Sequence, residues 1–253
     1  MGKPLYLTTT LPYVNSDPHI GHALELVQAD TYVRFRKSQG SEVFFNTGTD
    51  EHGQKIFEAA QKAGEPIQEY VDHYANEFKK LNGALGLSDD LVFIRTTDKH
   101  HVEAAQEMWK RCDAKGDIYK KEFEGLYCVG CEKYLTQKEI VDGKCAIHGV
   151  PPKLLKEENY FFKLSNYQKA LEDYLSKEGV VIPEWRRQEA LNFVREGLED
   201  FSISREKSRL AWGVPVPGDE NQVMYVWFDA LTNYISTLGW PEDTEGNFRK
   251  FWE

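Results

Sequence analysis

Two histidines stand three residues apart in a segment with the chemistry to bind phosphate. The string Leu11–His22 (LPYVNSDPHIGH) places His19 and His22 directly after an Asp–Pro pair, which is typical of a helix start. The free N–H groups of a helix N-terminus suit phosphate, and histidine side chains there add donors. Gly21, between them, lets a nucleotide approach the backbone closely. The spacing alone also fits two polar residues at an ordinary helix start.

A second group of residues has the spacing of a metal site. Cys128 and Cys131 form one C-x-x-C pair, and Cys145 and His148 form a C-x-x-H pair further along the chain. Three thiolates and one imidazole make a closed tetrahedral shell, which is typical of structural zinc and leaves no position for a reactive water. We therefore predict one structural zinc per chain that stabilises this segment without taking part in chemistry.

The elements around the histidines form a βαβ pattern. A strand over 4–10 precedes them, and Ile20, Ala23/Leu24, Val27, Thr31 and Phe35 recur at helical steps in a helix that ends at Gly40. A strand over 42–46, a loop over 47–53 and a helix over 55–63 follow. This order predicts a doubly wound parallel sheet, with ligands at the carboxyl ends of its strands.

Asp50 belongs to the loop that leaves the second strand, at the same edge of the sheet as the histidines. A carboxylate there can pair with the α-ammonium group of a bound amino acid. The alternative is an acidic residue that only caps the loop.

The rest of the chain is predicted to alternate between helices and short strands. We expect helices over 66–81, 98–115, 165–177 and 183–198, a strand over 91–97, a hairpin over 118–127, a returning strand over 159–164, and a strand over 223–228 followed by a helix that Asp229 caps and that ends at Leu238. The junction of the last two elements would place Trp227, Ala230 and Tyr234 on one face. His100 and His101 have no visible partner and are expected at the surface.

Composition limits the class of protein. The chain has 253 residues, of which 41% are hydrophobic and 13% aromatic, enough for a folded core. It contains no apolar run of about 20 residues, so no membrane span is expected. Cysteines that look reduced, together with a first segment unlike a signal peptide, predict a cytoplasmic protein. The net charge of −10 argues against a stand-alone nucleic-acid-binding domain.

Several segments resemble one family. Pro18–His22 (PHIGH) resembles the HIGH signature of class I aminoacyl-tRNA synthetases. Leu11-Pro12-Tyr13 and the string over 46–53 (NTGTDEHG) are similar to the methionyl-tRNA synthetases in particular. The segments over 200–205, 212–218 and 225–234 resemble that family's return into its catalytic fold, so the resemblance covers essentially the whole chain.

The resemblance implies an α/β fold with a Rossmann-type parallel sheet that a connective insertion interrupts. Residues 1–117 would form the first half of the catalytic domain, 118–195 the insertion with a zinc knuckle at about 126–150, and 196–253 the return into the catalytic domain. A single knuckle resembles the one-zinc branch of the family, and the insertion is too short for a separate editing domain.

The resemblance also implies a reaction and a site. The carboxylate of methionine would attack the α-phosphorus of ATP, which magnesium accompanies, and the methionyl group would then pass to methionine tRNA, bound here at its acceptor end. His19 and His22 would stabilise the transition state and bind ATP together with Gly21. The residues implied for methionine are Leu11, Tyr13, Asp50, Trp227, Ala230, Leu231 and Tyr234.

One part of the family pattern is missing from the chain. No KMSKS string occurs before Glu253, so we expect a carboxy-terminal remainder to supply that loop and expect residues 1–253 alone to be inactive. Two other hypotheses stay open at this point. One is another nucleotidylyltransferase of the HIGH type, and the other is a non-catalytic, synthetase-like module.

Overall fold

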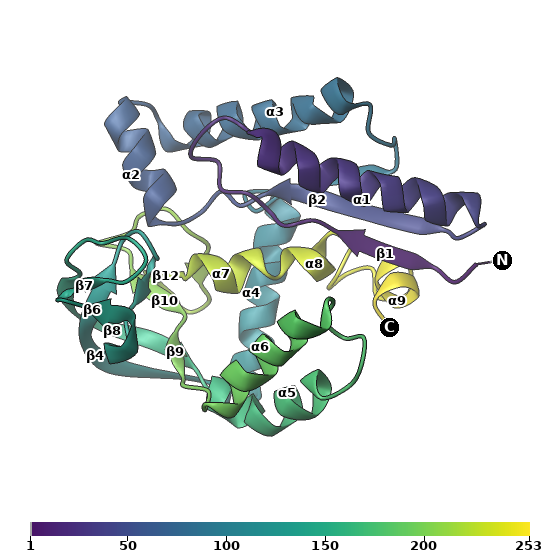
Figure 1. The fold of residues 1–253 in the computed structure, drawn as a ribbon. Helices are drawn as coiled ribbons and strands as arrows, with labels where there is room; N and C mark the ends of the chain where they lie inside the picture. The colour runs from purple at the N-terminus through teal and green to yellow at the C-terminus, as the bar shows by residue number, and fades with distance from the viewer. Residues whose placement is uncertain (1) are drawn as a thin grey trace.

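The computed structural model describes residues 2–253, and its centre is a parallel sheet (Figure 1). The strands β1 (Leu5–Thr8), β2 (Val43–Thr49) and β3 (Leu91–Arg95) are ordered β1-β2-β3, and both pairs are parallel. The central strand is largely buried because helices cover both faces of the sheet. This arrangement confirms the predicted α/β fold with a parallel sheet.

Four long helices accompany this sheet. They are α1 (Ile20–Ser38), α2 (Gln54–Ala63), α3 (Ile67–Leu85) and α4 (Lys99–Ala114). In Figure 1, α1 and α3 lie above the sheet, and α4 lies below it beside α7 (Val226–Ala230) and α8 (Asn233–Ser236). No helix in the described part of the chain is long and apolar enough to cross a membrane.

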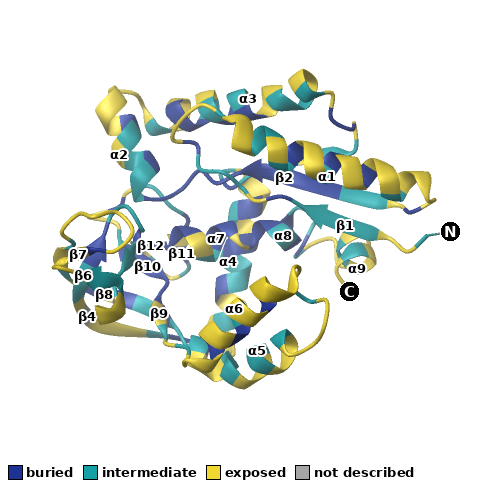
Figure 2. Cartoon of the chain, in the orientation of Figure 1, coloured by how far each residue is buried: buried dark blue, intermediate teal, exposed yellow. Residues whose placement is uncertain are grey.

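Helix α1 turns its apolar stripe away from the sheet. The residues that it buries are Leu26, Asp30 and Val33. Asp30 tolerates burial because it accepts hydrogen bonds from Arg34 and from the amide of Ser88. The large apolar side chains of the predicted stripe are exposed, as Figure 2 shows by the yellow on this helix: Ile20 (88%), Leu24 (58%), Val27 (42%) and Phe35 (56%).

The segment that follows α4 is built on one long antiparallel pair. Strand β4 (Ile118–Cys128) pairs with β8 (Lys153–Phe162), and β5 (Lys133–Tyr134) and β9 (Phe201–Ser202) complete the sheet in the order β5-β4-β8-β9. The predicted hairpin over 118–127 is therefore wrong, because the segment is one strand whose partner follows the knuckle. The returning strand begins at residue 153 rather than 159.

The remaining elements belong to the second half of the chain. They are η1 (Gln137–Glu139), β6 (Ile140–Val141), β7 (Lys144–Cys145), η2 (Leu164–Tyr167), α5 (Gln168–Leu175), α6 (Glu184–Arg195), β10 (Ser204–Glu206), β11 (Pro215–Val216), β12 (Asp219–Met224) and α9 (Asn247–Phe251). Strands β10, β12 and β11 form an antiparallel sheet in that order. A core cluster joins Trp109 of α4 to Ile203 and Met224 beside and in this sheet.

The strand predicted over 223–228 ends early. Strand β12 stops at Met224, and α7 begins at Val226 with Tyr225, in extended conformation, as its N-cap. Asp229 is thus not a cap but a fully buried residue inside α7. The aromatic run conceals this change because it fits a buried strand and a buried helix equally well.

Candidate functional site

The two histidines form the first turn of α1. His19 is the N-cap, and its Nδ1 accepts the amide proton of Gly21 at 3.1 Å. His22 Nδ1 accepts the amide proton of His19 at 3.2 Å, and the two rings stack with their centroids 3.7 Å apart. Since each Nδ1 is an acceptor, each ring carries a proton on Nε2. The turn therefore offers two side-chain N–H donors, one on each Nε2, at a helix N-terminus.

Local packing explains the glycine between them. A Cβ on Gly21 would lie 2.9 Å from the ring of His19, so a larger residue would displace that ring. Partial burial, and after it the proximity of His19, lowers the pKa of His22 below its usual 6.5. His22 is consequently a neutral hydrogen-bond donor at pH 7, suited to a phosphate or a developing oxyanion.

Asp50 lies opposite Tyr13, where the chain leaves β1 and β2. The Asp50 amide donates to the Pro12 carbonyl at 3.0 Å, so a short parallel bridge joins the two segments. The side chain is buried, and its Oδ1 has no hydrogen-bond partner among the described residues. Burial, followed by the charges of Asp229 and Glu132, raises the pKa of Asp50 well above its usual value. An unpaired buried carboxylate oxygen is a site for a cation.

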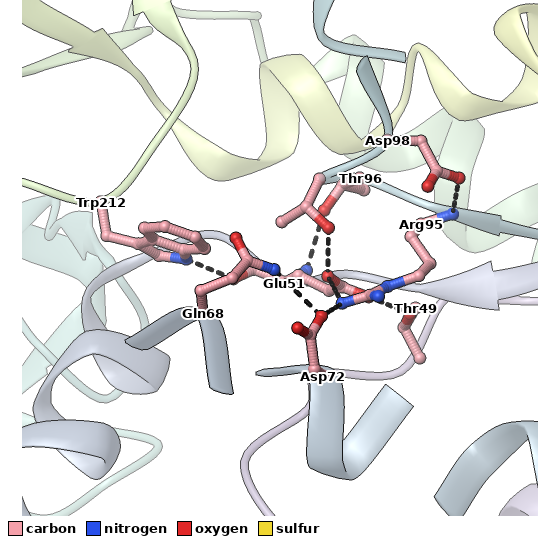
Figure 3. Close-up of polar contacts among 9 residues, drawn as sticks. Thr49, Glu51, Gln68, Asp72, Arg95, Thr96, Asp98 and Trp212 are labelled. Atoms are coloured by element: carbon pink, nitrogen blue, oxygen red, sulfur yellow. Dashed lines mark hydrogen bonds and ion pairs between the residues drawn. The ribbon is translucent and has the colours of Figure 1, made fainter. Parts of the chain in front are cut away.

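The next residue, Glu51, is held in a full set of contacts (Figure 3). Its carboxylate makes a bidentate pair with Arg95, with distances of 2.7 and 2.8 Å. Thr49 and Thr97 donate their hydroxyl protons to the same carboxylate at 2.6 and 2.5 Å. Asp72 accepts a further hydrogen bond from Arg95 at 2.5 Å.

The backbone of Glu51 is fixed as well. Its amide donates to Thr96 Oγ1 at 2.9 Å, and its carbonyl accepts from the indole of Trp212 at 2.6 Å (Figure 3). Both groups of the peptide are thus paired with side chains from distant segments. These contacts immobilise the loop and so determine where Asp50 lies.

A third buried carboxylate, Asp229, lies between two histidines. Its Oδ1 is 3.5 Å from His52 Nδ1 and 3.7 Å from His101 Nε2, and His101 Nδ1 is 3.0 Å from Ser236 Oγ. Although burial opposes it, the two histidines lower the pKa of Asp229. The expectation of a surface position is wrong for His101, which is fully buried. Its partner is more than a hundred residues away, so no local pattern reveals it.

Only some of the residues implied for methionine are in contact with one another. Trp227 Nε1 donates to the hydroxyl of Tyr13 at 3.2 Å, which joins α7 to the segment before the histidines. Trp227 and Leu231 are exposed by 57% and 58%, whereas Ala230 is buried. Leu11 and Tyr234 are half-buried, and the carbonyl of Tyr234 accepts from Tyr6 at 2.8 Å. Tyr13 thus joins the exposed ring of Trp227 to Asp50, with which its backbone forms the parallel bridge.

The four predicted metal ligands lie together. Their donor atoms, three Sγ and His148 Nδ1, are all within 4.8 Å of one another, and no disulfide joins the cysteines. Cys131 Sγ is 3.5 Å from Cys145 Sγ and 3.2 Å from His148 Nδ1. Tetrahedral ligands at about 2.3 Å from zinc are separated by about 3.8 Å, so the cluster fits one ion. Gly130 leaves space for the ring of His148, which a Cβ would approach to 2.7 Å.

Comparison with known proteins gives one consistent result. The family model described as tRNA synthetases class I (M) matches residues 5–148 and 135–253. The methionine–tRNA ligase of Clostridium perfringens is 45% identical over 99% of this chain, and that of Streptomyces coelicolor is 46% identical over 96%. A crystal structure of the Mycobacterium tuberculosis methionyl-tRNA synthetase bound by methionyl-adenylate superposes with a TM-score of 0.92 at 42% identity over 99% of the chain.

The chain spans only part of these relatives. It covers 39% of the Clostridium protein, 46% of the Streptomyces protein and 50% of the Mycobacterium chain.

Proposed function

The chain belongs to the class I tRNA synthetases of the type designated M, and from this premise we propose that the protein activates L-methionine with ATP and then charges methionine tRNA. A carboxylate oxygen of methionine would attack the α-phosphorus of ATP, and the bond to pyrophosphate would break. A ribose hydroxyl at the acceptor end of the tRNA would then take the methionyl group and release AMP. The observation that carries the proposal is the buried, unpaired Oδ1 of Asp50 beside an aromatic surface.

The site supports recognition of an amino acid with an apolar side chain. Asp50 would pair with the α-ammonium group, which supplies the cation that its environment lacks. A thioether is unbranched and polarizable, so it packs well against aromatic rings. The residues proposed for its pocket are Leu11, Tyr13, Trp227, Ala230, Leu231 and Tyr234.

The histidine turn supports the nucleotide half of the reaction. We assign to the Nε2–H groups of His19 and His22 the hydrogen bonding of charge that builds on the phosphate oxygens in the transition state. The close approach of the backbone at Gly21 would serve the same nucleotide. Magnesium, when bound with ATP, would neutralise part of the negative charge of the phosphates.

The open surfaces of this chain support a carboxy-terminal remainder as its partner. Within residues 2–253, β1 pairs with β2 alone, and the outer face of α1 exposes Ile20, Leu24 and Phe35. An unpaired edge beside an apolar helix face is the surface that a continuing sheet would cover. We propose that the remainder covers it and supplies the KMSKS loop. We also propose that residues 118–195 form an insertion between 1–117 and 196–253, and that the protein acts in the cytoplasm.

The cysteine cluster supports a structural zinc held by Cys128, Cys131, Cys145 and His148. The expected metal content of protein purified without chelator is one zinc per chain. Cys145→Ala should lower the metal content and the melting temperature together, and elemental analysis that finds no zinc in the unmutated protein would contradict the assignment.

The central experiment is ATP–pyrophosphate exchange by the complete protein. We expect exchange that depends on methionine, none from residues 1–253 alone, and recovery when the remainder is added in trans. Trp227→Ala should raise the KM for methionine strongly and leave the KM for ATP nearly unchanged. Trp185→Ala is the matched control, because Trp185 is equally exposed (55%) but lies on α6. Exchange that does not require methionine would refute the proposed function.

A further inference from the structure

A glutamate in the metal-binding turn is buried in an unusual backbone conformation. Glu132 directly follows the ligand Cys131, is only 3% exposed, and has a φ of 54°. A residue with a Cβ pays a conformational cost in the left-handed region, where glycine fits freely. The contacts of the Glu132 side chain therefore have to offset this conformational cost.

The carboxylate of Glu132 leaves the knuckle and reaches the catalytic half of the chain. Its Oε1 accepts the amide proton of Lys55 at 2.6 Å, and its Oε2 accepts the hydroxyl proton of Tyr13 at 3.1 Å. Gly53 provides the space for this approach, because a Cβ there would lie 3.0 Å from both oxygens. The knuckle turn and the segment that follows β2 are thus fitted to one another.

The contact with Tyr13 continues to Trp227. Tyr13 has one hydroxyl proton, and since it donates that proton to Glu132, its lone pairs remain for the indole N–H of Trp227. Because Trp227 is 57% exposed, packing alone does not fix its ring. Glu132 thereby sets the direction of the hydrogen-bond chain that holds the ring.

A second path from the same residue reaches Trp227. Its ring stacks on Tyr225, with centroids 6.4 Å apart and an interplanar angle of 17°. The guanidinium of Arg205 lies 4.9 Å from the centre of the Tyr225 ring and donates to the carbonyl oxygen of Glu132 at 3.3 Å. Trp227 is thus connected to Glu132 in two ways, through its hydrogen-bond partner Tyr13 and through its stacking partner Tyr225.

We propose that Glu132 is a positioning residue that couples the metal knuckle to the amino-acid pocket. It acts through Tyr13 and Trp227, and it touches neither the metal nor the reacting atoms. The assignment of the pocket to methionine rests on the proposed function, whereas the placement of Trp227 by Glu132 is independent of it.

The test compares two variants of the complete enzyme. Glu132→Gly removes the carboxylate and relieves the left-handed backbone. Asp142→Gly is its matched control: Asp142 lies in the same knuckle, has a φ of 50°, carries the same charge and is exposed. We expect Glu132→Gly to raise the KM for methionine about tenfold, with an unchanged KM for ATP and one metal per chain. Asp142→Gly should leave all three quantities unchanged.

A second readout does not depend on the reaction. The acrylamide quenching of Trp227 fluorescence, isolated by subtraction of a Trp227→Phe background, should increase in Glu132→Gly and stay constant in Asp142→Gly. The inference is overturned if this quenching is unchanged, if both KM values rise equally, or if the variant loses its metal. Absence of methionine-dependent exchange in the unmutated enzyme would refute the proposed function alone, since the change in Trp227 quenching would still decide the inference.

Discussion

Two neighbouring carboxylates, Asp50 and Glu51, are both buried, but their surroundings are opposite. Glu51 accepts hydrogen bonds from Arg95 and two threonines, and its backbone is paired as well. Asp50 lacks a partner for Oδ1 and lies near the negative charge of Asp229. The sheet edge thus contains one charge that the protein satisfies and one that it leaves unpaired. The first holds the loop in place, and the second is the one available to a ligand.

The largest expected change in stability comes from substituting Glu51, the carboxylate whose hydrogen bonds are all made. Glu51→Gln removes the buried charge partner of Arg95 and leaves the guanidinium with only the half-exposed carboxylate of Asp72. Loss of one member of a buried pair costs about 3–5 kcal/mol of unfolding free energy. Urea denaturation of the complete protein measures the change, and an unaltered midpoint would show that Glu51 is not the anchor of the loop.

Asp50→Asn should raise the free energy of unfolding, whereas Glu51→Gln lowers it. Burial raises the pKa of Asp50, so the folded state binds the proton more tightly than the unfolded state. The buried carboxyl group therefore costs stability at pH values where the unfolded chain ionises it, and this cost declines as the pH falls from the folded-state pKa towards the lower pKa of the unfolded state. The variant should be more stable by about 1–3 kcal/mol at pH 7 and lose methionine-dependent exchange. The gain should shrink on acidification in parallel denaturation curves, and a destabilised variant would contradict the comparison.

A smaller effect tests the backbone of the loop. Thr96→Val keeps the shape of a fully buried side chain and removes the hydroxyl that accepts the Glu51 amide proton. One lost hydrogen bond of this kind is worth about 1 kcal/mol. Thermal unfolding should show a decrease of that size, with the KM for methionine raised slightly because Asp50 is less well fixed. Thr244→Val, at an exposed turn before α9, is the control for the change of residue type.

The smallest effect concerns the outer partner of Arg95. Asp72 has a side chain that is 42% exposed, so water screens its ion pair and Asp72→Asn should cost at most about 0.5 kcal/mol. Although burial opposes it, hydrogen bonds from Arg95 and Gln68 lower the pKa of Asp72 below its usual 3.8. Its contribution is therefore present above about pH 4 and is lost as the pH falls further. A small difference between variant and parent at pH 7 that shrinks as the pH falls below about 4 would support this sign.

Local features of the sequence predict much of this molecule. The βαβ order, the histidine turn and the cysteine spacing depend on residues close together in the chain. The Asp142-Gly143 pair is also a local turn signal, and in the structure both residues have positive φ between β6 and β7.

Features that depend on distant partners are hidden from the sequence. His101 reads as a surface residue until α7 and α8 bring Asp229 and Ser236 against it. The apolar stripe of α1 is plain in the sequence, but the face that the sheet buries is a different one. Glu132 carries no local signal, since its partner Tyr13 is more than a hundred residues earlier.

The long antiparallel pair of β4 and β8 also sets a distance. Its register runs without interruption from Ile118 opposite Phe162 to Tyr127 opposite Lys153, and the knuckle lies at its far end. A strand lengthens by about 3.4 Å per residue, so two residues added to each strand would move the knuckle by about 7 Å. That displacement exceeds twice the length of the Glu132–Tyr13 hydrogen bond. The β4–β8 pair is thus a spacer of fixed length. Many of its residues can be substituted more easily than residues can be added or removed.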